Sequence, residues 1–139
     1  MKKLRYVVDA SVVVKALLKE SEKVTKKFEK ILALAESGGV LLLSHSLLPL
    51  EVANALRFSQ NPEEVIRDLY KVYLTLPIES VELTGALKEE ILAESYRFKT
   101  TVYDTSYHIL AKAYGAVFLT SDREYFKKAK ALGDIELVA

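Results

Sequence analysis

LRYVVDAS, residues 4–11, joins a short β-forming run to the beginning of a helix through an aspartate. The run Leu4–Val8 contains the β-branched and aromatic residues that favour strands. Helical spacing begins almost at once after Asp9, with Ser11 as a suitable N-cap. A strand that leads directly into a helix is the first half of a βα unit, from which parallel sheets are built.

The same alternation of strand and helix continues to the end of the chain. The sequence predicts further strands at residues 40–43, 78–83, 117–119 and 135–138, and helices at 21–37, 47–58, 62–74, 84–98, 104–114 and 123–131. Gly38-Gly39 is expected to end the first long helix, and Asn61 to cap the helix that begins at Pro62. We therefore expect an α/β fold, a three-layer sandwich with a central parallel sheet flanked by helices.

Length and composition indicate one globular domain, residues 1–139. Half of the residues are hydrophobic (50%) and 28% are charged, which argues against disorder. The absence of cysteine excludes disulfides and thiolate zinc sites and suits a reducing cytosol. The apolar run that follows Met-Lys-Lys stops at Asp9, too early for a signal peptide, and no apolar stretch reaches the roughly 18 residues of a membrane span. We expect a cytoplasmic protein that does not enter a membrane.

The balance of charge excludes a strong general attraction to nucleic acid. Twenty basic and nineteen acidic side chains give a net charge of only +1. An RNA substrate would therefore have to be held by a local basic rim and by metal ions. Candidates for that rim are Lys15, Arg57, Arg97, Lys99 and Arg123, although solvated charge on a helix face explains each of them equally well.

Four acidic residues, far apart in sequence, stand at the edges of segments that look buried: Asp9, Glu51, Asp104 and Asp122. Two carboxylates about 4 Å apart near a surface repel each other by roughly 4 kcal/mol. A fold that gathers four of them needs cations, and repulsion should raise the pKa of at least one carboxyl when no cation is present. Hard divalent cations with oxygen ligands indicate phosphoryl chemistry.

Each acid also has a simpler explanation. Asp9, Asp104 and Asp122 can each cap a helix, and Ser121-Asp122-Arg123-Glu124 has the spacing of a capping box. Glu51 differs, because its neighbours at helical spacing are mainly apolar, so that a cation or a basic partner is expected beside it. These neighbours are Leu47, Leu48, Asn54 and Ala55. The functional interpretation rests on the set of four and not on one acid alone.

Four motifs in this order resemble the PIN-domain nucleases, and more narrowly the VapC-like toxins of prokaryotic toxin–antitoxin pairs. They are VDAS at residues 8–11, LEVANAL at 50–56, YDTSYHILA at 103–111 and FLTSD at 118–122. The resemblance spans nearly the whole chain. It implies a PIN-like sandwich that hydrolyses RNA phosphodiester bonds with Mg²⁺ or Mn²⁺ at an acidic pocket.

The resemblance also assigns roles. It implies that Asp9, Glu51, Asp104 and Asp122 form the catalytic and metal-binding site. Ser11, Thr120 and Ser121 match the polar residues that support the first and last acids. We expect Asp9 and Asp104 to ligate metal directly, Glu51 to orient or deprotonate the attacking water, and Ser11 to bond a phosphate. The implied partners are RNA, a second copy of the chain and a small antitoxin.

Two rival functions remain open at this stage. One is a PIN-like scaffold without activity, which binds RNA or protein. The other is a metal-dependent phosphatase, but the haloacid-dehalogenase type needs a second Asp where Ser11 stands. His108 is interpreted as a packed residue, His45 as a loop residue, and the apolar side chains of Val65, Leu69 and Val72 as either core or a dimer face.

Overall fold

The computed structural model describes residues 3–139, so that residues 1 and 2 of the predicted domain lie outside the described residues. The described part contains strands β1 (Leu4–Val8), β2 (Val40–His45), β3 (Glu79–Val81), β4 (Val117–Thr120) and β5 (Ile135–Leu137). Its helices are α1 (Ala10–Leu17), α2 (Glu22–Glu36), α3 (Leu48–Arg57), α4 (Glu63–Tyr73), α5 (Gly85–Phe98), α6 (Val102–Ala113) and α7 (Arg123–Ala129), with a 3₁₀ turn at Lys130–Leu132.

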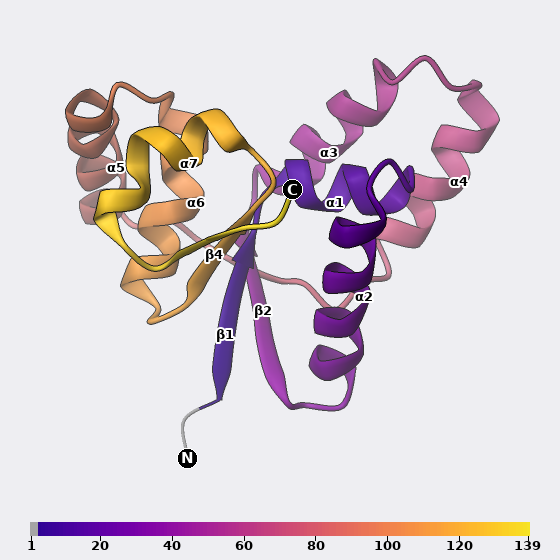
Figure 1. Cartoon of the computed structure of the whole chain (residues 1–139), viewed down its shortest axis with the longest axis horizontal. Coiled ribbons are helices and arrows are strands. Elements are labelled where there is room, and N and C mark those ends of the chain that lie inside the picture. Colours follow the sequence, from indigo (N-terminus) through magenta and orange to yellow (C-terminus); the bar gives the residue numbers. More distant parts are fainter. Residues whose placement is uncertain (1–2) are drawn as a thin grey trace.

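The five strands form one parallel sheet in the order β3-β2-β1-β4-β5. Helices α1 to α4 lie on one side of the sheet and α5 to α7 on the other (Figure 1). The predicted three-layer α/β sandwich is therefore confirmed. Strand β1 is central, and its Val7 and Val8 are fully buried because helices cover both of its faces.

Local sequence explains where the long helices begin and end. Ser21 caps α2 by accepting a hydrogen bond from the backbone N–H of Val24, as its position before the helical pattern predicts. Beyond α2, Gly38 takes a positive φ of 82°, which lets the chain reverse into β2. None of the helices within residues 3–139 is long and apolar enough to cross a membrane.

Several predicted boundaries were wrong by a few residues. Helix α4 is capped at Pro62 and not at Asn61, since the proline has the extended backbone of a cap residue. Strand β3 keeps only three of its six predicted residues, because it is an outer strand that pairs with β2 alone. Strand β2 is longer than predicted and includes His45, which pairs with Val81 and is 1% exposed, so that its interpretation as a loop residue was wrong.

The topology sets the place of the functional groups. Helices α3 and α7 follow β2 and β4 directly and so begin at the carboxyl ends of these strands, whereas α6 packs along the sheet and leads into β4, so that it begins at the same edge. Helices α3, α6 and α7 therefore all begin at the same edge of the sheet. Helix α6 packs against β1, β2 and β4, with Leu110 and Ala111 fully buried.

Candidate active site

Asp9 and Asp122 come to one edge of the sheet because β1 and β4 are parallel neighbours. Val8 pairs with Leu119 in the register of these strands, which puts the residues that follow them side by side. The hydroxyl of Thr120 donates to Oδ2 of Asp9 at 2.7 Å, across the two strand ends. The strand-end position of both acids, predicted from the sequence, thus has a direct structural cause.

Asp9 is a buried acid, 9% exposed, with several donors around its carboxylate. Its Oδ1 accepts from the Ser11 hydroxyl at 2.5 Å and from the backbone N–H of Val12 at 3.3 Å. Asp9 is consequently the N-cap of α1, and the prediction that Ser11 caps this helix was wrong. Burial nevertheless raises the pKa of Asp9 to about 6, with a smaller increase from Asp104, although the three hydrogen bonds lower it.

A network of hydroxyl and amide groups holds in place the side chains that bond the carboxylate of Asp9. Ser11 Oγ accepts from the backbone N–H of Ser121 at 3.0 Å, and Ser121 Oγ accepts from Lys15 Nζ at 2.6 Å. The hydroxyl of Thr120 in turn accepts from the backbone N–H of Asp122 at 3.1 Å. Because the proton of Ser11 is directed to Asp9, the predicted hydrogen bond from Ser11 to a phosphate does not fit this arrangement.

Glu51 lies in the first turn of α3 and has one partnered and one unpartnered oxygen. The hydroxyl of Tyr107 donates to Oε2 at 2.8 Å, while Oε1 is buried and has no hydrogen-bond partner among the described residues. The partner expected for this acid is thus a neutral tyrosine and not a basic side chain. Burial raises the pKa of Glu51, and the charges of Asp104 and Asp9 raise it further.

Asp104 lies in the first turn of α6 and does not open the helix. Thr101 is the cap, since its hydroxyl accepts from the backbone N–H of Asp104 at 3.0 Å. The carboxylate of Asp104 is therefore not needed to begin the helix. Burial raises the pKa of Asp104, the nearby charge of Asp122 raises it further, and Lys128 lowers it.

Asp122 has the capping role that the sequence left open for it. Its Oδ1 accepts from the backbone N–H of Tyr125 at 3.0 Å, so that it is the N-cap of α7. A capping role and a role in a metal site are compatible, because Oδ2 takes no part in this hydrogen bond.

Electrostatic interactions connect all four acids. Asp104 raises the pKa of both Asp9 and Glu51, and Asp122 raises that of Asp104. Thr120 bonds both Asp9 and the backbone N–H of Asp122, and Asp104 and Asp122 line the same hollow, so that the three aspartates lie on one side of the molecule. The pKa is raised at Asp9, Glu51 and Asp104, as expected, although burial is a larger cause than mutual repulsion.

The side chains do not form a closed metal cage. Within residues 3–139, no group of three or more Asp, Glu and His side chains is arranged to hold one metal ion. The donors still suit Mg²⁺ or Mn²⁺, because all four are carboxylates and the buried Oε1 of Glu51 lacks a partner. Mg²⁺ commonly takes only one or two protein carboxylates and keeps several waters, so that an open acidic site is suitable.

Two hollows adjoin the acids, one polar and one apolar. The polar hollow, about 310 Å³, is lined by Lys99, Thr100, Thr101, Asp104, Asp122, Glu124, Tyr125 and Lys128. The apolar hollow, about 300 Å³, is lined by Leu47, Leu50, Glu51, Asn54 and Tyr103. Of the five basic residues predicted for an RNA rim, only Lys99 lines one of these two hollows.

Sequence reasoning missed two residues that the structure brings to the acids. Lys128 was not among the basic residues predicted for the site, yet it lines the polar hollow and lowers the pKa of Asp104. Tyr107 appeared only as part of the motif YDTSYHILA, and its bond to Glu51 was not predicted. No spacing rule connects Tyr107 with a residue 56 positions earlier.

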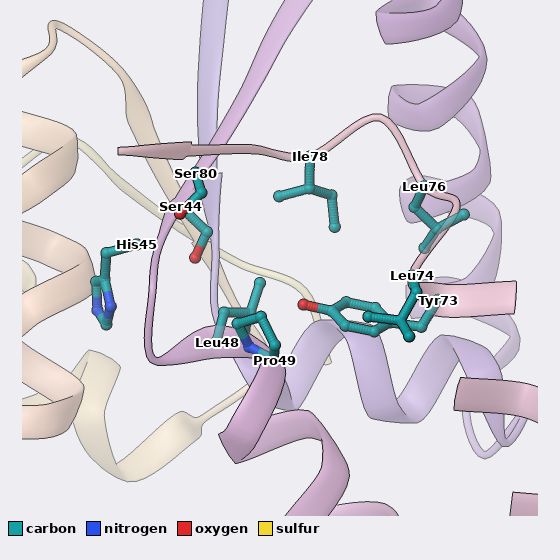
Figure 2. Close-up of a pocket in the computed structure, with 9 residues that line it drawn as sticks. All are labelled: Ser44, His45, Leu48, Pro49, Tyr73, Leu74, Leu76, Ile78 and Ser80. Carbon is teal, nitrogen blue, oxygen red and sulfur yellow. The ribbon is translucent and has the colours of Figure 1, made fainter. Parts of the chain in front are cut away.

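Neither histidine belongs to the group of acids. His108 is fully buried and bonds the hydroxyl of Tyr125 at 2.7 Å and the carbonyl of Gly133 at 2.6 Å, so that it is packed as expected. His45 lies at the margin of a separate cavity of about 120 Å³ between β2 and helices α3 and α4 (Figure 2). That cavity contains none of the four acids, and its lining is largely apolar.

The fold and the site together define a class of α/β proteins, those with a parallel five-stranded sandwich and acidic residues at the carboxyl edge of the sheet. The family model of the PIN domain matches residues 6–132, and the chain belongs to the PIN domain family. A comparison with curated protein sequences gives no significant match.

Solved structures share this fold over nearly the whole chain. PAE2754 from Pyrobaculum aerophilum is 25% identical, with a TM-score of 0.68, covering 95% of this chain and 83% of that one. VapBC2 from Rickettsia felis, bound to a DNA fragment from the promoter, is 16% identical (TM-score 0.70, covering 98% and 100%). VapC20 of Mycobacterium tuberculosis, a Sarcin-Ricin loop cleaving toxin, is 14% identical (TM-score 0.68, covering 96% and 99%).

Proposed function

We propose that residues 1–139 act as one metal-dependent ribonuclease domain, which hydrolyses RNA phosphodiester bonds at Asp9, Glu51, Asp104 and Asp122. The observation that carries this proposal is the gathering of acids at one edge of the sheet, where the Thr120 hydroxyl bonds both Asp9 and the backbone N–H of Asp122, and Asp104 and Asp122 line one hollow. Three of them have raised pKa values, and one buried oxygen has no partner. Such a group is unfavourable by itself and is stabilised by divalent cations.

Each acid has a role in this proposal. When bound, Mg²⁺ or Mn²⁺ would lower the pKa of a water and neutralise charge on the scissile phosphate. Asp9 and Asp104 would hold the metal, with Asp122 completing the site directly or through water. Glu51 would orient the attacking water or accept its proton through Oε1. Ser11, Thr120 and Ser121 would fix the carboxylate of Asp9 by the hydrogen bonds described above.

We further propose that the protein is the toxin of a toxin–antitoxin pair that acts on RNA in the cytoplasm. Two of the similar solved structures are named for VapBC or VapC proteins, which supports this assignment. The partners would be a cognate antitoxin and a second copy of the chain. Val65 and Val72 on α4 are 44% and 53% exposed, and they offer an apolar face on which two copies could meet.

Labelled RNA distinguishes this function from its rivals. The protein is incubated with single-stranded RNA in Mn²⁺, in Mg²⁺ and in EDTA, and cleavage is expected only with metal. Asp104→Asn should abolish cleavage. Glu124→Gln is the matched control, because Glu124 lines the same polar hollow but is exposed. RNA binding without cleavage would support the scaffold, and phosphate release from a small phosphomonoester would support the phosphatase.

A further inference from the structure

Tyr107 joins the buried core to one of the four acids. It lies on α6, one turn after Asp104, and is 1% exposed. Its hydroxyl donates to Oε2 of Glu51 at 2.8 Å. A buried tyrosine hydroxyl needs a partner, and a backbone carbonyl would satisfy that need equally well. The hydroxyl of Tyr107 instead bonds a carboxylate of the acidic site, which indicates a functional role.

The ring of Tyr107 is held firmly on both sides. It stacks on His45, with ring centroids 4.2 Å apart and an interplanar angle of 23°, and on Phe118 at 6.2 Å and 14°. Rings packed in this way have little freedom to tilt. The position of the hydroxyl is therefore set by the core of the protein and not by Glu51.

His45 is itself fixed at both ring nitrogens. The backbone N–H of Leu47 donates to Nδ1 at 3.3 Å, so that the proton of the neutral ring is on Nε2, which then donates to Ser106 Oγ at 2.7 Å. Ser106 donates onward to the carbonyl of Tyr103 at 2.6 Å, which uses its single proton. His45 also lines the margin of the small cavity, where Figure 2 shows its ring apart from Tyr73.

The hydrogen bond from Tyr107 makes the two oxygens of Glu51 unequal. Oε2 is engaged, whereas Oε1 is buried and without a partner among the described residues. A carboxylate with one fixed oxygen cannot turn its plane freely, so that the other oxygen is held in one place. Supporting hydrogen bonds of this kind orient metal ligands and are commonly worth about 10- to 100-fold in metal affinity or activity.

We propose that Tyr107 is a positioning residue of the acidic site, which holds Oε2 of Glu51 and thereby directs Oε1 toward a divalent cation, either directly or through the attacking water that this cation binds. This inference rests on the proposed metal-dependent function. It goes beyond that function by assigning a role to a residue outside the four acids, and by assigning different roles to the two oxygens of one of them.

Mn²⁺ binding to the RNA-free protein tests this role. Tyr107→Phe keeps the ring between His45 and Phe118 and removes only the hydroxyl. Calorimetric titration should show Mn²⁺ affinity reduced about 10- to 100-fold, and RNA cleavage should show a lower kcat with an unchanged KM. The control is Tyr70→Phe. Tyr70 lies on α4, and its hydroxyl donates at 2.7 Å to the carbonyl of Pro49 on α3, the helix that carries Glu51. Tyr70→Phe should leave Mn²⁺ affinity unchanged.

A double-mutant cycle separates positioning from general support of the fold. If Tyr107 acts through Glu51, Tyr107→Phe should cause no further loss of Mn²⁺ affinity in a Glu51→Gln protein. Glu51→Asp, which keeps the charge but withdraws it from the hydroxyl, should weaken binding as Tyr107→Phe does. Additive losses, or an equal loss in Tyr70→Phe, would overturn the inference.

The outcomes also separate this inference from the function on which it rests. A wild-type protein that neither binds Mn²⁺ nor cuts RNA overturns both. Normal Mn²⁺ affinity in a folded Tyr107→Phe protein, alongside normal wild-type activity, overturns only the role of Tyr107. Circular dichroism and urea unfolding establish that the variants are folded.

Discussion

Asp9→Asn should make the metal-free protein more stable at neutral pH. Burial raises the pKa of Asp9 from 3.8 to about 6. The folded protein therefore holds this proton more tightly than the unfolded chain, and ionisation lowers the free energy of unfolding. The loss begins as the pH rises above 3.8 and is complete above about 6. At about 1.4 kcal/mol for each pKa unit, it amounts to about 3 kcal/mol at neutral pH.

Asp9→Asn removes the free-energy cost of ionising Asp9, but it also weakens hydrogen bonds that the carboxylate accepts. Ser11 and Thr120 both donate to the carboxylate, and an amide offers only one oxygen to them. Losing one such bond costs about 1–2 kcal/mol, so that the net gain near neutral pH should be about 1–2 kcal/mol. The cost of ionisation is only about 1 kcal/mol near pH 4.5. The advantage of Asp9→Asn should therefore grow by about 2 kcal/mol between about pH 4.5 and about pH 7.5.

Urea unfolding in EDTA at these two pH values measures the effect. Asp68→Asn is the control, because Asp68 is an exposed acid on α4 and the substitution is the same. The difference in free energy of unfolding between Asp68→Asn and wild type should not change comparably between the two pH values. A stability difference between wild type and Asp9→Asn that is equal at both pH values would refute the reasoning, since the effect would then not come from ionisation of Asp9.

A hydroxyl, a histidine and the pKa of Asp9 each give a further measurable outcome. Thr120→Val removes a donor to Asp9 and an acceptor for a backbone N–H, so that the free energy of unfolding in urea should fall by about 1–3 kcal/mol; an unchanged midpoint would argue against this network. His108→Leu leaves two buried groups unpaired and should cost about 2–4 kcal/mol, but Mn²⁺-dependent cleavage should persist below the melting temperature. Loss of cleavage in that folded variant would favour a metal role for His108. Finally, because metal binds the ionised form of Asp9, cleavage at limiting Mn²⁺ should decline as the pH falls below about 6; a constant rate down to about pH 5 would contradict this.

The sequence was sufficient for the order of the elements and for the place of the strand-end acids. The run Val117–Leu119 is short and apolar, follows Gly115 and leads into the polar residues Thr120 and Ser121, which together favour a buried strand. An acid directly after such a strand must lie at the carboxyl edge of the sheet. Asp9 and Asp122 could therefore be placed without coordinates, and β1 and β4 do lie beside each other.

The contacts between distant elements could not be predicted. The bond between Tyr107 and Glu51 depends on how α6 and α3 sit on opposite faces of the sheet near one edge, which helical spacing does not describe. His45 was misassigned because a polar Ser-His pair usually ends a strand, whereas here stacking on Tyr107 stabilises a buried histidine. The start of α6 was misplaced because Asp104 was expected to cap the helix, while Thr101 takes that position.

The sheet has an outer strand of three residues on each side, β3 and β5. Each offers few free backbone groups to a foreign chain, and short outer strands are one of the ways in which proteins avoid sheet-to-sheet aggregation. Copies of this protein that collide at high concentration thus lack a template for growing a continuous intermolecular β-structure.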